Sequence, residues 1–164
     1  QRLIRRQAEH DAMTDALNRG SFEKLLHMYE NGDTPYALIL IDVDTFKTVN
    51  DMYGHAVGDE ILKKVTGLLK KAFRSIDHVC RIGGDEFAVI ITENPNQVEE
   101  LIHSFDSNVA NWHGKFVDSM TVSYGWVFST ERNWGSAYEI SKAADARMYQ
   151  SKERYYKESG ADRR

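Results

Sequence analysis

Apolar residues recur along the chain at two spacings, which predict an alternation of helices and strands. Apolar side chains three or four positions apart predict helices over residues 14–31, 56–74, 95–113 and 136–157. Shorter apolar runs predict strands over residues 36–43, 79–82, 86–92 and 120–129. The run at 36–43 is continuous and rich in branched residues, which is typical of a strand buried on both faces.

The order of these elements indicates a fold class. After a first helix the chain reads β-α-β-β-α-β-α, and Gly83–Gly84 join the two central strands as a hairpin. This is the order of the split β-α-β, or ferredoxin-like, arrangement with additional helices. We therefore expect an α+β domain in which the first strand lies beside the central hairpin.

The remaining residues mark the expected ends of this domain. Residues 1–12 are polar with a few apolar positions on one face, and they predict a linker helix that enters from upstream. The folded domain is expected to span residues 13–158, and the polar residues 159–164 are expected to form a disordered tail. Because the chain does not begin with Met, we expect it to be part of a larger protein.

Composition narrows the function classes. The chain has 164 residues, 41% of them hydrophobic and 28% charged, as in one globular domain. Its net charge of −4 argues against a protein that coats nucleic acid, because no basic excess exists to bind phosphates. The single cysteine, Cys80, excludes an internal disulfide and a cysteine-based zinc site. No run approaches the ~20 apolar residues of a membrane span, so we expect a cytoplasmic domain without membrane contact, with any anchor of the full-length protein upstream.

Acidic residues stand at the ends of strands that should be neighbours. Asp42 and Asp44 end the first strand and share a face, because alternate strand residues point the same way. Asp85 and Glu86 follow the hairpin glycines. Asp42 and Asp85 would then converge on one Mg²⁺ ion, which prefers oxygen ligands. The alternative is that these acidic residues are ordinary turn caps.

Five segments resemble, in the same order, the motifs of the GGDEF family of diguanylate cyclases. The family signature is matched by RIGGDEF at residues 81–87. The other matched segments are residues 11–19 (DAMTDALNR), 42–51 (DVDTFKTVND), 53–59 (YGHAVGD) and 144–152 (ADARMYQSK). Together they extend the resemblance over about residues 10–157. The resemblance implies a fold similar to the palm domains of nucleotide cyclases and polymerases.

The family condenses two GTP molecules into cyclic di-GMP and releases pyrophosphate. The resemblance implies that Asp42 and Asp85 hold Mg²⁺ or Mn²⁺, with the backbone carbonyl of Val43 as a further ligand. It also implies that Glu86 lies beside the ribose 3′-hydroxyl and helps to activate it. A hydroxyl is a poor nucleophile until its proton is accepted or a metal lowers its pKa.

Other matched positions imply contacts with the substrate. Asn50 and Asp59 correspond to the family's guanine readers; without the resemblance they would be a helix-end cap and an acidic residue near a helix N-terminus. The backbone near Phe46 and the side chain of Lys152 correspond to phosphate contacts. The arginine that commonly follows this lysine four positions later is replaced by Tyr156. Loss of that charge-assisted contact would weaken GTP binding and leaves open a domain that binds nucleotide but turns over slowly.

A second pair of residues matches a regulatory motif of the family. Arg74 and Asp77 form an R-x-x-D that corresponds to the product-inhibition site in residue type and in distance from the signature. A planar guanidinium suits this role because it stacks on guanine and bonds to its acceptors. The alternative is a surface ion pair at a helix end.

The resemblance leads to one functional hypothesis and two alternatives. The hypothesis is a diguanylate cyclase domain that acts in signal transduction downstream of a sensor domain. Each site holds one GTP, so cyclic di-GMP forms only where two copies of the domain face each other in a homodimer. One alternative is a non-catalytic module that binds GTP or cyclic di-GMP and regulates a neighbour. The other is an enzyme with a mixed or mononucleotide cyclic product.

Overall fold

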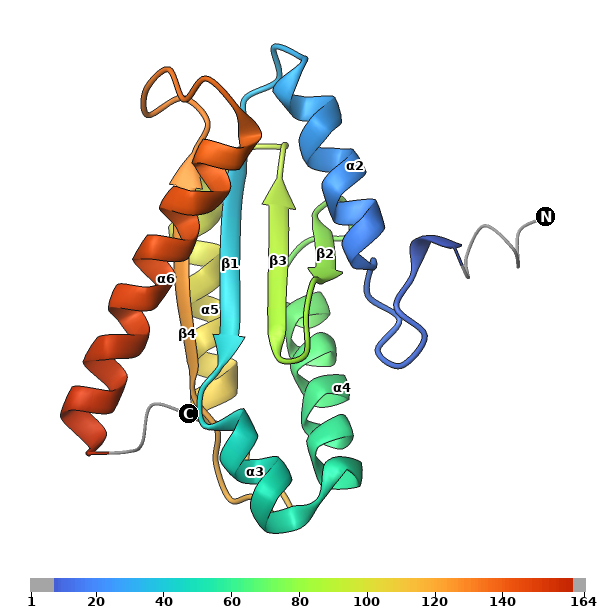
Figure 1. The fold of residues 1–164 in the computed structure, drawn as a ribbon, viewed down its shortest axis with the longest axis vertical. Helices are drawn as coiled ribbons and strands as arrows, with labels where there is room; N and C mark the ends of the chain where they lie inside the picture. Colours follow the sequence, from blue (N-terminus) through green and yellow to red (C-terminus); the bar gives the residue numbers. More distant parts are fainter. Residues whose placement is uncertain (1–7, 161–164) are drawn as a thin grey trace.

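Four strands form one antiparallel sheet in the order β2-β3-β1-β4 (Figure 1). The computed structural model describes residues 8–160. The strands are β1 (Ala37–Val43), β2 (His78–Arg81), β3 (Glu86–Ile91) and β4 (Val122–Phe128). β1 pairs with both β3 and β4, so the first strand lies in the middle of the sheet beside the central hairpin. This confirms the expected arrangement.

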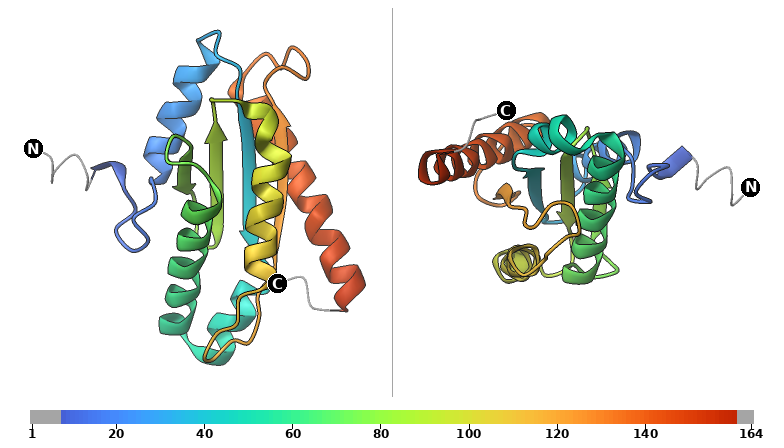
Figure 2. Two further views of the ribbon diagram at one scale, coloured as in Figure 1. Left: turned by 180° about the vertical axis from the view of Figure 1, so that it is seen from behind. Right: turned by 90° about the horizontal axis from the view of Figure 1, so that it is seen from below.

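Helices cover both faces of the sheet (Figure 2). α4 and α5 pack against one face, and α2 and α6 pack against the other. The helices are α2 (Arg19–Glu30), α3 (Phe46–Tyr53), α4 (His55–Ala72), α5 (Val98–Ala110) and α6 (Ala137–Ser159), with a 3₁₀ turn, η1 (Pro95–Gln97), before α5. The expected α+β class with additional helices is confirmed.

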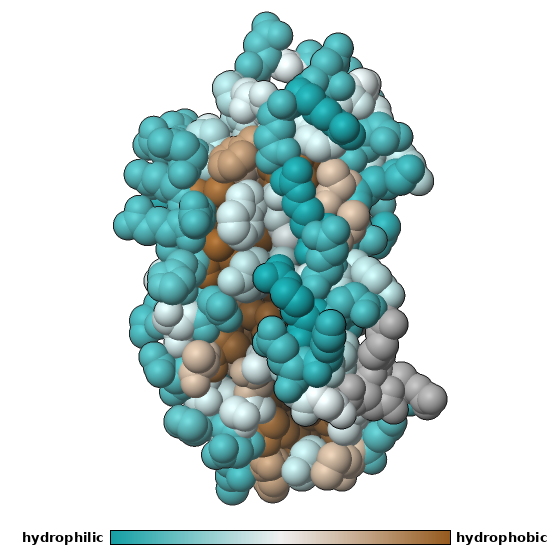
Figure 3. Space-filling model, turned by 90° about the vertical axis from the view of Figure 1, so that its left-hand side faces the viewer, coloured by the Kyte–Doolittle hydropathy of each residue, from teal (hydrophilic) through white to brown (hydrophobic). Residues whose placement is uncertain are grey.

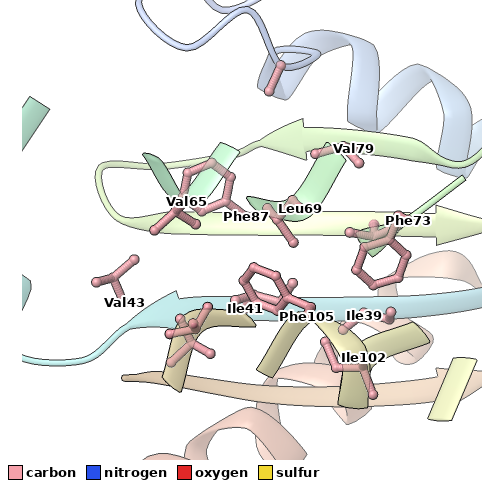
Figure 4. Close-up of a cluster of buried hydrophobic side chains, with 14 of the residues drawn as sticks. Ile39, Ile41, Val43, Val65, Leu69, Phe73, Val79, Phe87, Ile102 and Phe105 are labelled. Atoms are coloured by element: carbon pink, nitrogen blue, oxygen red, sulfur yellow. The ribbon is translucent and has the colours of Figure 1, made fainter. Parts of the chain in front are cut away.

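The double burial of β1 explains its continuous apolar sequence. Ile39, Ile41 and Val43 face the cluster formed with α4 and α5 (Figure 4), whereas Leu38 and Leu40 face the cluster formed with α2 and α6. Because alternate residues point to opposite faces, a strand covered on both sides needs apolar residues throughout. Each fully buried side chain of this kind stabilises the fold by roughly 1.5–3 kcal/mol. This burial fixes the position of the acidic residues at the end of the strand.

α6 packs tightly against the sheet at Gly125 of β4. A Cβ atom at this position would lie 2.3 Å from the backbone nitrogen of Met148 and 2.6 Å from the carbonyl oxygen of Ala144. The helix therefore packs on the strand backbone itself. This contact sets the position of the next turn of α6, which carries Lys152.

The outer edges of the sheet carry hydrogen bonds of their own. Along β4, the side chains of Arg147 and Ser151 bond to backbone groups that face away from β1. Along β2, the backbone of Leu17 bonds to two groups that face away from β3. Figure 3 shows the side of the molecule formed by α6 and β4, where hydrophilic side chains border a hollow with an apolar floor.

α3 is an element missing from the predicted order. It is only eight residues long and none of them is fully buried, although Phe46 and Val49, three positions apart, pack against the core. This apolar spacing is too short to mark a helix by itself. The helix begins after Thr45, which has a φ of 56°, and it ends at Gly54, which has a φ of 88°. Positive φ favours glycine, and Gly54 lets the chain turn directly from α3 into α4.

The ends of the chain fall largely outside the described residues. Of the linker helix expected over 1–12, residues 1–7 are not described, and His10 already pairs with Leu17 in a β-bridge. At the other end α6 continues to Ser159, Gly160 caps it, and residues 161–164 are not described. The boundaries at 13 and 158 stay a prediction. Between residues 8 and 160, no helix has both the length and the hydropathy of a membrane span.

Candidate active site

Three carboxylates meet where β1 ends beside the β2–β3 turn. Asp42 of β1 pairs in register with Glu86, the first residue of β3. The N–H of Val43 donates to the carbonyl oxygen of Asp85 at 3.1 Å. The sheet therefore brings Asp42, Asp85 and Glu86 together, as the order of the strands predicts.

Lys152 reaches this cluster from α6. Its Nζ donates to Oδ2 of Asp42 at 2.5 Å. The other oxygen, Oδ1, is buried and has no hydrogen-bond partner among the described residues. Such an oxygen is costly to bury, and a cation would satisfy it. The donor set thus fits Mg²⁺ or Mn²⁺, with Asp42, Asp85 and the carbonyl of Val43 as candidate ligands.

The protein would supply only part of the coordination of such an ion. Within residues 8–160, no group of three or more His, Cys, Asp or Glu side chains is placed to hold a metal. Mg²⁺ is commonly held by one or two carboxylates together with water and substrate phosphates. We therefore expect metal binding at Asp42 and Asp85 to depend on a phosphate-bearing ligand.

The cluster carries an excess of negative charge that disfavours full ionisation. Burial, a hydrogen bond with Asp42 and the charge of Asp42 raise the pKa of Asp85 to about 7. Burial, together with the nearby carboxylates of Asp42 and Asp145, raises the pKa of Glu86. A carboxylate with a raised pKa is a better proton acceptor, which suits a general base.

Glu86 also borders a cavity between α2 and α6. The cavity has a volume of about 630 Å³, and its charged lining includes Arg19, Lys142 and Asp145 beside Glu86. It opens on the face of the sheet away from α4 and α5. The arrangement leaves room for a polar ligand next to this carboxylate.

Asp44, the second acidic residue after β1, is committed to the fold. It is 2% exposed and accepts hydrogen bonds from Ser123 Oγ at 2.6 Å and Thr121 Oγ1 at 2.8 Å. Its N–H donates to the carbonyl oxygen of Thr121. Asp44 therefore ties the end of β1 to β4, and Asp42 is the residue left to meet a ligand.

Tyr156 fills the position where the family commonly has an arginine. It is 5% exposed, and its hydroxyl accepts a hydrogen bond from the N–H of Thr45 at 3.3 Å. Thr45 connects β1 to α3, so Tyr156 packs over the turn that follows the carboxylates. Lys152 lies one helical turn earlier on the same side of α6.

The residues matched to guanine recognition lie on α3 and α4. Asn50 is on α3 and Asp59 is the fifth residue of α4, and these two helices pack together. Asn50 Oδ1 is buried without a hydrogen-bond partner among the described residues, whereas Asp59 is exposed. Phe46 begins α3 directly after the carboxylate end of β1, so it lies between the two groups of site residues.

Arg74 and Asp77 form a pair just beyond the end of α4. Arg74 Nε and Nη2 bond to the two oxygens of Asp77 at 3.1 and 3.0 Å, and the Asp77 side chain is 0% exposed. Arg74 also donates to Gln97 Oε1 and to the carbonyl oxygen of Glu93, which follows β3. The pair therefore sits at the opposite end of β3 from Glu86.

Arg81, the first residue of the RIGGDEF segment, fixes the β2–β3 turn. Its Nε and Nη2 donate to the carbonyl oxygen of Gly84 at 3.1 and 2.9 Å. Its Nη1 donates to both oxygens of Asp11 at 3.2 Å. Arg19 holds the same turn by donating to the carbonyl oxygen of Ile82 at 2.9 Å. The turn is thus bonded to the segment that precedes α2.

The chain matches a known protein family over almost its whole length. The family model described as "Diguanylate cyclase, GGDEF domain" matches residues 8–157. The chain belongs to the GGDEF family. Among its relatives, the probable diguanylate cyclase DgcT of Escherichia coli is 32% identical over 160 residues, covering 93% of this chain and 35% of that protein. The response regulator PleD of Caulobacter vibrioides is 34% identical over 152 residues, covering 87% of this chain and 33% of that protein.

Solved structures of GGDEF domains share the fold. The GGDEF domain of DgcB from Caulobacter crescentus, solved in complex with c-di-GMP, is 29% identical and superposes with a TM-score of 0.79. The match covers 89% of this chain and 91% of that one. The first curated relatives are longer proteins, of which this chain spans between 14% and 44%. The GGDEF resemblance of the sequence is confirmed.

Some contacts of this GGDEF domain could not be predicted from its sequence. The hydrogen bond between Tyr156 and Thr45 joins residues 111 positions apart, and no local sequence pattern predicts it. The bond between Arg81 and Asp11 joins two matched motifs, and only the fold shows that they touch.

Proposed function

We propose that this domain is a catalytic diguanylate cyclase that condenses two GTP molecules into cyclic di-GMP and releases pyrophosphate. The observation that carries the proposal is the cluster of Asp42, Asp85 and Glu86 at one end of the sheet. One oxygen of Asp42 is buried there without a partner, and Lys152 neutralises the other. Membership of the GGDEF family supports the reaction class.

In this proposal the residues of the cluster divide the work of phosphoryl transfer. Asp42 and Asp85, with the carbonyl of Val43, would hold Mg²⁺ or Mn²⁺, which when bound neutralises charge on the phosphates. Glu86 accepts the proton of the ribose 3′-hydroxyl. The 3′-oxygen then bonds to the α-phosphorus of the facing GTP, and the bond to the β-phosphate breaks. Lys152 moves from Asp42 to a phosphate oxygen of the triphosphate.

Substrate choice and assembly follow from the remaining site residues. Asn50 and Asp59 read the guanine base, and the backbone at Phe46 faces the triphosphate. Each domain binds one GTP, so two copies must face each other as a homodimer, and the cavity beside Glu86 leaves room for the partner's substrate. We further propose that the domain works in the cytoplasm under the control of an upstream sensor domain, and that Arg74 and Asp77 bind product.

The test is incubation of the protein with GTP and Mg²⁺, followed by chromatography of the products. We expect cyclic di-GMP and pyrophosphate, and no product when Mg²⁺ is left out. Asp85→Asn, which keeps the shape of the side chain and removes its charge, should abolish turnover while the circular dichroism spectrum is unchanged. A variant that keeps most of its cyclic di-GMP production would contradict the assignment of Asp85.

Tyr156 favours a second candidate, a module that binds nucleotide without turning it over. A buried phenol stands where the family commonly has a cationic contact to phosphate, and its hydroxyl is already bonded to Thr45. Under this alternative, calorimetry would detect binding of GTP or cyclic di-GMP while the incubation yields no product. If the wild-type protein forms cyclic di-GMP at any rate and Asp85→Asn forms none, the domain is an enzyme and this second candidate is excluded.

A further inference from the structure

Gly58, in the first turn of α4, faces the side chain of Asn50 with no room for a methyl group. A Cβ atom at Gly58 would lie 1.9 Å from Asn50 Oδ1 and 3.2 Å from Cζ of Phe46. Non-bonded contacts of a Cβ atom shorter than 3.0 Å essentially never occur in proteins. The Asn50 amide oxygen therefore occupies the space that any other residue at position 58 would fill.

The helix itself gives no reason for a glycine at this position. Gly58 is helical, and glycine inside a helix is less favourable than alanine. Gly67, on the same helix, has no atom within 4 Å of its Cβ position, so a methyl group would be accepted there without a clash. The glycine at position 58 is thus explained by the side chain opposite it and not by its backbone.

The Asn50 amide is held by packing alone. Its Oδ1 is buried and has no hydrogen-bond partner among the described residues. A clash with the end of a side chain is relieved most easily by rotation of that side chain. A methyl group at position 58 would therefore turn the Asn50 amide away and leave the helices in place.

We propose that Gly58 is a positioning residue for guanine recognition, because the absence of its side chain seats the amide of Asn50 for contact with the base. This inference rests on the proposed function, in which Asn50 and Asp59 read guanine. Gly58 does not touch the nucleotide and acts through Asn50. A larger residue at position 58 would leave a protein that binds the triphosphate and discriminates poorly between bases.

A double-mutant cycle tests whether Gly58 acts through Asn50. Calorimetry gives the affinity of a non-hydrolysable GTP analogue with Mg²⁺ for wild type, Gly58→Ala, Asn50→Ala and the double variant. We expect each single substitution to weaken binding about tenfold, the scale of one lost hydrogen bond. The double variant should bind no more weakly than Asn50→Ala. Gly67→Ala is the matched control and should bind as wild type does.

Binding of an ATP analogue distinguishes base recognition from general damage to the site, because general damage would weaken both nucleotides equally. The ATP analogue carries the same triphosphate, so its weaker affinity should be equal in all four proteins of the cycle. Gly58→Ala should therefore reduce the preference for the GTP analogue over the ATP analogue about tenfold. Equal losses for both nucleotides would indicate general damage to the site and would overturn the inference.

The remaining outcomes separate this inference from the proposed function. If Asn50→Ala weakens GTP binding and Gly58→Ala does not, the role of Gly58 is overturned and guanine recognition stands. If Asn50→Ala has no effect on the GTP analogue, the role of Asn50 fails and the inference fails with it. If the losses of binding free energy from the two single substitutions add in the double variant, the inference about Gly58 is also overturned. Should Gly58→Ala melt below wild type, Asn50→Ala should restore its melting temperature by vacating the space, and no recovery would refute the contact.

Discussion

Lys152 shows how one side chain can serve two partners in the proposed reaction. It bonds to Asp42, the carboxylate matched to the metal, and its neighbour one turn later is the buried Tyr156. The ion pair holds the ammonium group at the site before nucleotide arrives. When a cation takes over the charge of Asp42, the lysine becomes available to the triphosphate.

Lys152→Ala should therefore weaken binding of a GTP analogue about tenfold, because one charge-assisted hydrogen bond to phosphate is lost. Calorimetry with Mg²⁺ present measures the effect. Lys157→Ala, an exposed position on the same helix, is the control and should leave the affinity unchanged. Equal affinities for wild type and Lys152→Ala would show that the lysine serves Asp42 alone.

Tyr156→Arg should tighten binding of the same analogue by roughly tenfold, because it adds a second cation beside Lys152. The phenol is buried, so the unliganded variant should also melt at a lower temperature than wild type. Tyr156→Phe removes the bond to Thr45 without adding charge, and it separates the two effects. An unchanged dissociation constant for Tyr156→Arg would mean that position 156 does not reach the phosphates.

At the residue scale, the sequence could predict which candidate site residues lie together but not the bonds between them. The motifs bring out Asp42, Asp85 and Glu86, and alternate strand positions correctly place Asp42 and Asp44 together. They cannot show that Asp44 is satisfied by two hydroxyl groups, one just before β4 and one within it, that lie 77 and 79 positions away. Such bonds depend on strand register, which forms only when the sheet does.

At the scale of elements, the β2–β3 turn is held by two arginines in addition to its own backbone hydrogen bonds. Arg81 bonds both to Gly84 within the turn and to Asp11 in the segment before α2. A movement of the segment before α2 would therefore shift the turn that carries Asp85 and Glu86. The bond gives a physical route between the N-terminal segment and the site.

Asp11→Asn should lower the free energy of unfolding at neutral pH and have a smaller effect in acid. Burial opposes ionisation of Asp11, but hydrogen bonds from Thr14 and the charge of Arg81 outweigh it and lower its pKa. The ionised carboxylate therefore adds stability above its unfolded pKa of about 3.9, and this stability is lost as pH falls through the folded pKa. Urea unfolding at pH 7 and at pH 3 measures the difference.

The control for this prediction is Asp33→Asn, in the exposed loop between α2 and β1. Its effect on the free energy of unfolding should be small at both pH values. An Asp11→Asn effect that is the same at pH 7 and at pH 3 would show that the charge of Asp11 contributes nothing.

Gly125→Ala should lower the free energy of unfolding by about 1–3 kcal/mol, because its methyl group would meet the backbone of α6. Gly67→Ala is the matched control on α4, where the space is open and alanine should stabilise the helix by up to about 1 kcal/mol. Urea unfolding compares the two. A Gly125→Ala protein as stable as wild type would mean that α6 shifts without cost.

Most elements could be predicted because their apolar periods are strong. The apolar run of β1 predicts a strand buried on both faces, and the structure confirms this. The two glycines predict the central hairpin, which is also present. α3 is not predicted, because its eight residues carry only a short apolar spacing and its start depends on the left-handed backbone of Thr45. Its position is set by the turn from β1 and by packing against α4, both of which are properties of the folded chain.

On the scale of the whole molecule, the proposed active site and the Arg74–Asp77 pair lie at opposite ends of β3. The Arg74 side chain makes four hydrogen bonds within the protein. Most of its N–H groups are therefore committed, and recognition of product would rely on stacking of a base on the guanidinium plane. The site already described would remain accessible to GTP.

Arg74→Ala should raise the concentration of cyclic di-GMP needed for half inhibition at least tenfold, because the stacking cation is removed. Initial rates at increasing product concentration measure the change. Lys71→Ala, at the end of α4, is the control for a nearby positive charge and should leave inhibition as in wild type. Equal product affinities of Arg74→Ala and wild type in calorimetry would mean that the pair is only a structural ion bridge.

The bonds along the outer edges of β2 and β4 bear on how two copies of the domain meet. Extension of the sheet by a second copy is disfavoured there, because side chains of α6 bond to two outward-facing groups of β4 and the backbone of Leu17 bonds to two of β2. In the proposed homodimer, two copies would then meet through surface side chains, and a small interface of this kind would give transient association. The rate per molecule would rise with protein concentration, and a tether that holds two copies together would replace that dependence with a fixed effective concentration. Control of activity would then include control of how often two substrates are presented to each other.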